Sequence, residues 1–252
     1  MSVTLIPLNG LPMVQPDDDL AGLIGDAAER CGAGLVAGDV LVVCQKIISK
    51  AEGRIVRLVD VKPGERARAF AEQFEKDPAV VELALAEASE VLRMENGHLI
   101  TATGPGWVCA NSGLDRSNQN RDGEVTLLPV DADRSAARLR EGLHARLGVQ
   151  VAVVVSDTFG RPWRLGQLDF AIGAAGFDVL EDHDERADMA GRKLEHTMIA
   201  VADQLAAAGG LLAGKAEGVP AVIVRGFGGL PPAGDYASAA DLIRPREDDL
   251  FR

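Results

Sequence analysis

A carboxylate and a hydroxyl directly follow the most apolar run of the chain. The run spans Val151 to Val155, and Ser156, Asp157 and Thr158 come next. An uninterrupted apolar run of this length favours a buried strand, which would present the following polar side chains from a rigid position. Carboxylate and hydroxyl oxygens are the donors that Mg²⁺ and Mn²⁺ prefer. The segment therefore predicts a divalent-cation site at Asp157, with a capped turn as the alternative.

Two arginines lie close behind these residues, at Arg161 and Arg164. Guanidinium groups bind phosphate and carboxylate oxygens through paired hydrogen bonds. Next to a metal carboxylate they predict a clamp for an anionic substrate or transition state. The alternative is that they pair with nearby acidic side chains.

Two further polar segments could complete such a site. In the loop from Cys109 to Asn118, Asp115 could give a second carboxylate to the cation, and Asn118 could reach a nucleotide. An Asx-rich turn is the commoner reading of this loop. Lys46 and Lys50 follow a predicted strand and could bind phosphate, although solvated surface lysines are the more frequent case.

No motif indicates covalent catalysis or a familiar nucleotide-binding loop. The four histidines are scattered, and neither G-x-G-x-x-G nor G-x-x-x-x-G-K-[ST] occurs. A nucleotide would have to be bound by another device.

Strands and helices mix without the strict alternation of a doubly wound sheet, so the pattern predicts an α+β fold. Apolar runs and periodicity predict strands at 3–7, 39–44, 98–103, 125–128, 151–155, 167–173 and 219–224, and helices at 17–31, 63–76, 78–92, 135–147 and 194–213. Asp133 is the expected N-cap of the helix at 135–147. The proline- and charge-rich segment 231–252 is expected to be a surface extension.

The chain of 252 residues carries 38 acidic and 26 basic side chains, a formal net charge of −12. Such a surface argues against nucleic-acid or anionic-membrane binding. Three scattered cysteines form no disulfide or zinc pattern. We expect a cytoplasmic protein, because neither a signal peptide nor a membrane-spanning stretch is evident.

Taken together, the segments resemble the coenzyme F420-0:L-glutamate ligase family, which also forms the N-terminal part of a longer mycobacterial ligase. The resemblance covers nearly the whole chain up to Gly226. It rests on the motifs QKIISKAEG at 45–53, NSGLDRSN at 111–118, SDTFGRPWRLG at 156–166, ADQLA at 202–206, and the segment 214–226.

This resemblance implies a ligase in which GTP phosphorylates a carboxylate of the F420 precursor. The amine of L-glutamate then attacks the acyl phosphate, and an amide forms. It implies Mg²⁺ or Mn²⁺, allows for K⁺, and places Asp115 and Asp157 on one divalent cation and Thr158 on a second. The residues implied to contact GTP are Leu11, Pro12, Met13, Val14, Gln45, Lys46, Lys50, Asn118, Gly214, Lys215, Ala216, Glu217 and Gly218.

Three residues depart from the family pattern. Met13 stands where an acidic residue is frequent, and Gln204 stands where the helix often has Glu. Lys215 stands where a metal-binding Glu or Gln can occur, and a charged lysine cannot ligate a metal. Glu217 is the nearby substitute that we consider for that ligand.

The resemblance also implies an intertwined homodimer and a ligase domain over residues 1–230, which could comprise two subdomains. The chain carries no flavin-binding reductase domain of the longer ligases, so we expect ligation alone. Two rival interpretations use the same residues. One is a metal-dependent phosphohydrolase or phosphotransferase that acts on another small molecule, and the other is a non-catalytic GTP-binding module.

Overall fold

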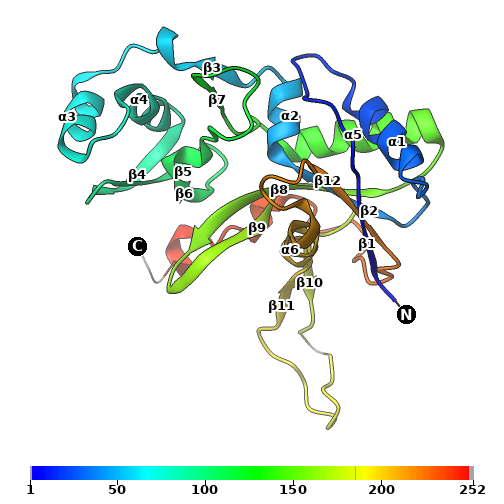
Figure 1. Cartoon of the computed structure of the whole chain (residues 1–252). Coiled ribbons are helices and arrows are strands. Elements are labelled where there is room, and N and C mark those ends of the chain that lie inside the picture. The colour runs from blue at the N-terminus through cyan, green and yellow to red at the C-terminus, as the bar shows by residue number, and fades with distance from the viewer. Residues whose placement is uncertain (1, 185, 250–252) are drawn as a thin grey trace.

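The computed structural model describes residues 2–184 and 186–249 and confirms a mixed α+β fold with several small sheets (Figure 1). The helices are α1 (Leu20–Arg30), α2 (Gln45–Ala51), α3 (Glu65–Phe74), α4 (Pro78–Ala86), α5 (Ala132–Leu147) and α6 (Val201–Ala213), with short 3-10 turns at Leu58–Asp60, Asn111–Gly113, Ala239–Leu242 and Arg246–Asp248. The strands are β1 (Thr4–Pro7), β2 (Val40–Cys44), β3 (Ile55–Arg57), β4 (Ala88–Glu95), β5 (His98–Thr103), β6 (Val108–Ala110), β7 (Glu124–Thr126), β8 (Ala152–Arg161), β9 (Arg164–Ala175), β10 (Leu180–Asp182), β11 (Met198–Ala200) and β12 (Ala221–Arg225).

The body of the protein is a five-stranded sheet in the order β1-β12-β2-β8-β9, in which only β2 and β8 are parallel neighbours. Its central strands are buried on both faces, which is why they read as continuous apolar runs. Leu41 and Val153 face the side covered by α1 and α5, whereas Val42 and Val154 face the side covered by α6. The buried strands of this sheet therefore hold two polar segments in place: the first residues of α2, which directly follow β2, and the polar second half of β8.

A second lobe holds α3, α4 and the three-stranded sheet β4-β5-β6, at the left of Figure 1. It has its own apolar cluster, which includes Phe70, Val81 and Leu99. The antiparallel β3 and β7 lie between this lobe and the body. Within the described part of the chain, no helix is both long enough and apolar enough to span a bilayer.

The predicted helix over 78–92 is wrong in its second half. Helix α4 ends at Ala86, and residues 88–95 form β4, which pairs antiparallel with β5. Two register irregularities in β4 disturb the period-2 alternation that would have marked it as a strand. Pairing with β5 and burial of Val91 against the lobe core decide its conformation.

Two helix starts also differ from expectation. The helix predicted over 194–213 begins at Val201, because Met198–Ala200 pairs with β10 at the base of a projecting arm. The N-cap of α5 is Asp131, whose carboxylate accepts from the backbone N–H of Arg134. The Asp133 carboxylate instead accepts from the backbone N–H groups of Ala174 and Ala239, which links α5 to β9 and to the C-terminal segment.

The strand that was expected to end at Val155 continues to Arg161. It forms a long hairpin with β9, in which Asp157 lies opposite Phe170 and Thr158 opposite Asp169. The candidate metal residues thus lie inside a strand rather than at its end. The hairpin carries them outward from the sheet and underneath the second lobe (Figure 1).

Candidate functional site

The β8–β9 hairpin and the second lobe line an open cavity of about 720 Å³. Asp157, Thr158 and Arg161 line it from β8, and Asp115 and Ser117 line it from the loop after β6. Its remaining lining residues are Arg93, Ile100, Val108, Cys109, Ala110, Asn111, Gly113, Leu114, Phe159, Gly160, Pro162, Gln167 and Lys215. Segments that are far apart in sequence therefore supply carboxylates and cations to one space.

Asp115 is held by a lysine of α2. Lys46 Nζ lies 2.8 Å from Asp115 Oδ2 and donates to Ser117 Oγ at 2.6 Å. Burial alone would raise the pKa of Asp115, but the contacts from Lys46 and the N–H of Ser117 hold it below its ordinary value. Asp115 is therefore an ionised carboxylate that faces the cavity.

The pKa of Asp157 is shifted in the opposite direction to that of Asp115. Its pKa is raised from 3.8 to about 7, mainly by burial and also by the charges of Asp115 and Asp169, while the Thr158 N–H and Lys215 act in the opposite direction. A buried carboxylate that is repelled by its neighbours is stabilised in its charged form by a cation. The pair Asp115 and Asp157 thus fits a divalent cation bound by hard oxygen donors.

This carboxylate pair does not by itself complete a metal site. No group of three or more His, Cys, Asp or Glu side chains is arranged to hold a metal within residues 2–184 and 186–249. A cation at Asp115 and Asp157 would therefore need further oxygen ligands from water or from a phosphorylated substrate.

Thr158 is already engaged on both sides. Its hydroxyl donates to the Asp169 carboxylate of the neighbouring strand and accepts from Lys215 Nζ at 2.5 Å. Asp169 fits against α6 because Gly210 has no side chain there, and a Cβ at Gly210 would lie 2.6 Å from Asp169 Oδ2. A positively charged ammonium group thus lies against the Thr158 hydroxyl, where the resemblance implies a second cation.

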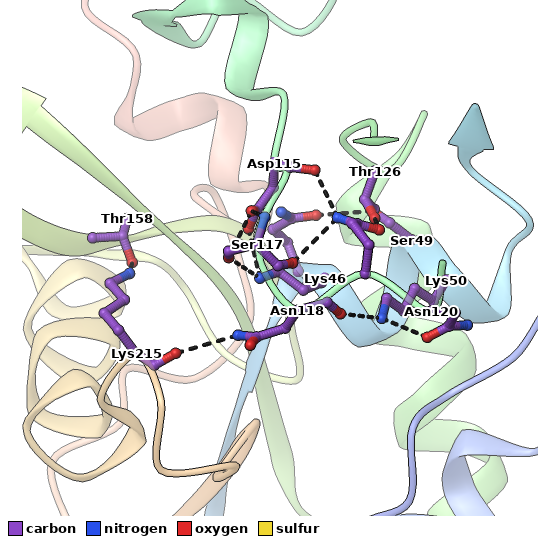
Figure 2. A network of polar contacts seen from close by, with 12 residues as sticks. Lys46, Ser49, Lys50, Asp115, Ser117, Asn118, Asn120, Thr126, Thr158 and Lys215 are labelled. Carbon is purple, nitrogen blue, oxygen red and sulfur yellow. Dashed lines mark hydrogen bonds and ion pairs between the residues drawn. The ribbon is translucent and has the colours of Figure 1, made fainter. Parts of the chain in front are cut away.

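Lys50 is buried, with 3% of its surface exposed, so the alternative of a solvated surface lysine does not hold for this residue. Its ammonium donates to the carbonyl of Asn118 at 2.6 Å and to Asn120 Oδ1 at 2.9 Å (Figure 2). Desolvation, together with the charge of Lys46, lowers its pKa. The sequence does contain a signal that Lys50 faces the same side as Lys46, because it lies one helical turn later on a helix that follows a buried strand.

Two asparagines of the loop that contacts Lys50 connect it to the N-terminal segment and to the segment after α6. Asn120 Nδ2 donates to the carbonyl of Val14 at 3.0 Å, and Asn118 Nδ2 donates to the carbonyl of Lys215 at 3.2 Å. The predicted nucleotide-contact segments around residues 11–14, 45–50, 118 and 214–218 are thereby joined in one network, most of which is drawn in Figure 2. Among the residues of the first segment, Val14 is buried and Met13 is exposed.

Gln45 is fully buried at the start of α2. Its Oε1 accepts from Ser49 Oγ at 2.9 Å, whereas its Nε2 has no hydrogen-bond partner in the described part of the chain. A buried donor without a partner costs free energy, so its retention here favours a ligand or water as its acceptor.

The two arginines are separated by the hairpin turn at Pro162–Trp163. Arg161 lines the cavity, and its guanidinium donates to the carbonyl of Gly166 at 3.3 Å. Arg164 is exposed on the returning strand and does not line the cavity. The structure therefore brings Arg161, but not Arg164, to the carboxylates.

Glu217, which we considered as the substitute ligand, turns toward its own loop in this structure. Its Oε2 accepts from the backbone N–H groups of Lys215 and Ala216 at 2.7 and 2.8 Å, and these contacts lower its pKa. The carboxylate folds back on its own loop, where Gly214 and Gly218 take positive φ, and it does not line the cavity.

Sequence reasoning missed three residues that the site uses. Asp169 meets Thr158, Asn120 connects Lys50 to Val14, and Arg93 brings a second guanidinium to the cavity from β4. Asn120 could have been found, since it lies two residues after Asn118 in the same polar loop. Asp169 and Arg93 become visible only through strand pairing.

Comparison with known proteins finds relatives along nearly the whole chain. Residues 10–226 match the family model of the F420-0:Gamma-glutamyl ligase. The chain is 44% identical to the coenzyme F420:L-glutamate ligase of Methanothermobacter thermautotrophicus, and the match covers all of both chains. It is 44% identical to the enzyme of that name from Methanopyrus kandleri, over 95% of this chain and 93% of the relative, and 41% identical to that from Archaeoglobus fulgidus, over 100% and 97%.

These matches identify an enzyme of the amino-acid ligase class. The chain belongs to the F420-0:Gamma-glutamyl ligase family. The resemblance that the motifs indicated is therefore confirmed.

Proposed function

We propose that the protein joins L-glutamate to the carboxylate of a coenzyme F420 precursor in a GTP-dependent reaction. The γ-phosphoryl group of GTP passes to that carboxylate, which gives an acyl phosphate and GDP. The glutamate amine attacks the acyl carbon, phosphate leaves, and the amine loses a proton as the amide forms. The observation that carries the proposal is the convergence of the family segments 111–118, 156–166 and 214–226 on one cavity that the carboxylates of Asp115 and Asp157 line.

The chain's own residues would contribute mainly position and charge. Lys46 and Lys50 hold the loop of Asp115 and Asn118 against α2, and this loop would define one wall of the nucleotide site. Arg161 offers a guanidinium to an anionic group of the substrate or the transition state. Such preorganised charges lower a phosphoryl-transfer barrier without a covalent intermediate on the enzyme.

The cation proposed at Asp115 and Asp157 is Mg²⁺ or Mn²⁺, with K⁺ as a further cation to be tested. When bound, it would neutralise phosphate oxygens during transfer. The fit rests on the hard oxygen donors and on the repulsion between the two carboxylates.

The proposed reaction predicts that GTP turnover requires both L-glutamate and the deazaflavin precursor, because the acyl phosphate needs an acceptor carboxylate and its breakdown needs the amine. Phosphate release should be measured with each substrate omitted in turn, and the product mass should be determined by mass spectrometry. Equal release without glutamate and acceptor would instead indicate a phosphohydrolase. GTP binding without turnover would indicate a binding module.

We also propose a homodimer, whose interface includes the tip of the β8–β9 hairpin. Leu165 is fully exposed there and Leu168 is 37% exposed, an apolar tip that a partner chain would cover. Light scattering should give twice the 26.5 kDa chain mass at micromolar concentration. Leu165→Glu should shift the mass toward the monomer, whereas Val59→Glu, an exposed apolar position on the 3-10 turn after β3, should leave it unchanged. A monomeric wild type would refute the dimer.

A further inference from the structure

We infer that the ammonium group of Lys215 takes the place of a second divalent cation beside Thr158, so that each chain binds one divalent cation rather than two. The inference rests on the proposed nucleotide and metal site. It follows from a disagreement between the second cation that the family resemblance implies and the groups that surround Thr158.

The hydrogen bonds around Thr158 have a defined direction. A lysine ammonium can only donate and a carboxylate can only accept. The Thr158 hydroxyl therefore accepts from Lys215 Nζ and donates to Asp169. The hydroxyl oxygen keeps a second lone pair, but the ammonium that lies against it is a positive charge, which would repel a divalent ion bound to the same oxygen.

The charged groups around Thr158 also favour one divalent cation rather than two. The Asp157 carboxylate lies within electrostatic reach of the carboxylates of Asp115 and Asp169. Lys46 neutralises Asp115 at 2.8 Å, and Lys215 acts on Asp157 while it contacts Thr158. These two ammonium groups already offset much of the negative charge of the three carboxylates, which leaves less attraction for a second divalent cation than for a first.

The backbone of Lys215 is fixed from both sides. Its N–H donates to Glu217 Oε2, and its carbonyl accepts from Asn118 Nδ2. Figure 2 shows the side chain extending from this anchored backbone to Thr158, across the space between β8 and the loop of Asn118. The loop thus presents the ammonium at a defined position, where it could bind a phosphate oxygen as a permanent cation.

The test is a metal count. Equilibrium dialysis against Mn²⁺, with and without a non-hydrolysable GTP analogue, should give one Mn²⁺ per wild-type chain. Lys215→Gln, which removes the ammonium and adds an oxygen donor, should bind two. Lys62→Gln, at an exposed lysine outside the cavity, should bind one. Thermal melts of the metal-free proteins would establish that the three are equally folded.

A wild-type count of zero or two would overturn the inference. So would a count of one in Lys215→Gln, because the ammonium would then not be what limits the number. The count needs neither glutamate nor the deazaflavin acceptor, so failure of ligation would be recognised separately in the turnover assay. Failure of nucleotide binding would appear in the analogue count, and the arm with Mn²⁺ alone would still decide the question.

Discussion

Asp157→Asn should remove ligation while it stabilises the metal-free protein at neutral pH. The buried carboxylate has a pKa of about 7 in the fold and 3.8 as the reference value of the unfolded chain. Between these values the folded state holds a proton that the unfolded state has released, so the free energy of unfolding falls as pH rises. The loss should be roughly 4 kcal/mol by pH 8, equivalent to about 10 °C in melting temperature for a chain of this size.

The asparagine variant lacks this titration, so its melting temperature should stay nearly flat over the same pH range and exceed that of the metal-free wild type at pH 8. Mn²⁺ should raise the melting temperature of the wild type by mass action and that of the variant much less. Ligation should fall by at least about 100-fold, as it does when one preorganised electrostatic partner of a transition state is removed. Melts at pH 5 and pH 8, with and without Mn²⁺, and one activity assay measure all three effects.

Asp39→Asn provides the matched control. Asp39 is buried and pairs with Arg225 at 2.7 Å on the sheet, away from the cavity. Its variant should melt lower than wild type because Arg225 loses a charged partner, yet it should keep the Mn²⁺ shift. If Asp157→Asn behaved in the same way, Asp157 would be a structural aspartate and the cation site would be refuted.

Lys50→Met should weaken GTP binding by at least about 10-fold and lower stability by roughly 1–3 kcal/mol, since it removes two hydrogen bonds from a charged donor. The methionine roughly keeps the length of the side chain, but the carbonyl of Asn118 and Oδ1 of Asn120 lose their partner. The loop that connects Val14, Lys46 and Lys215 should then loosen. Binding of a fluorescent GTP analogue and thermal unfolding should be measured on the same preparation.

Lys62→Met, at an exposed lysine outside the network, should change neither quantity. The decisive comparison is the stabilisation that saturating GTP gives to each protein, because this separates weaker binding from a general loss of stability. An unchanged GTP affinity in Lys50→Met, with only the melting temperature lowered, would make Lys50 a structural residue without a role in the nucleotide site.

The sequence by itself determined the parts of this protein that depend on local pattern. Apolar runs located β2, β8 and β12, because strands covered on both faces lack polar positions. The motifs around Asp115 and Asp157 identified the family, because a motif is defined by the order and types of its residues and needs no structure to be recognised. The α+β class followed from the same reading.

Pairing between distant segments decided the rest. The residues of β4 were predicted to be helical, because a short stretch of sequence reveals neither the pairing with β5 nor the irregular register of that pairing. The sequence left open whether Lys50 is solvated, because the residues that it contacts, Asn118 and Asn120, lie about 70 residues away along the chain. Asp169 and Lys215 meet Thr158 through strand register and a loop about 57 residues away along the chain. Local propensity cannot encode such contacts, since they form only when the packed fold removes these polar groups from water and they must find partners in one another.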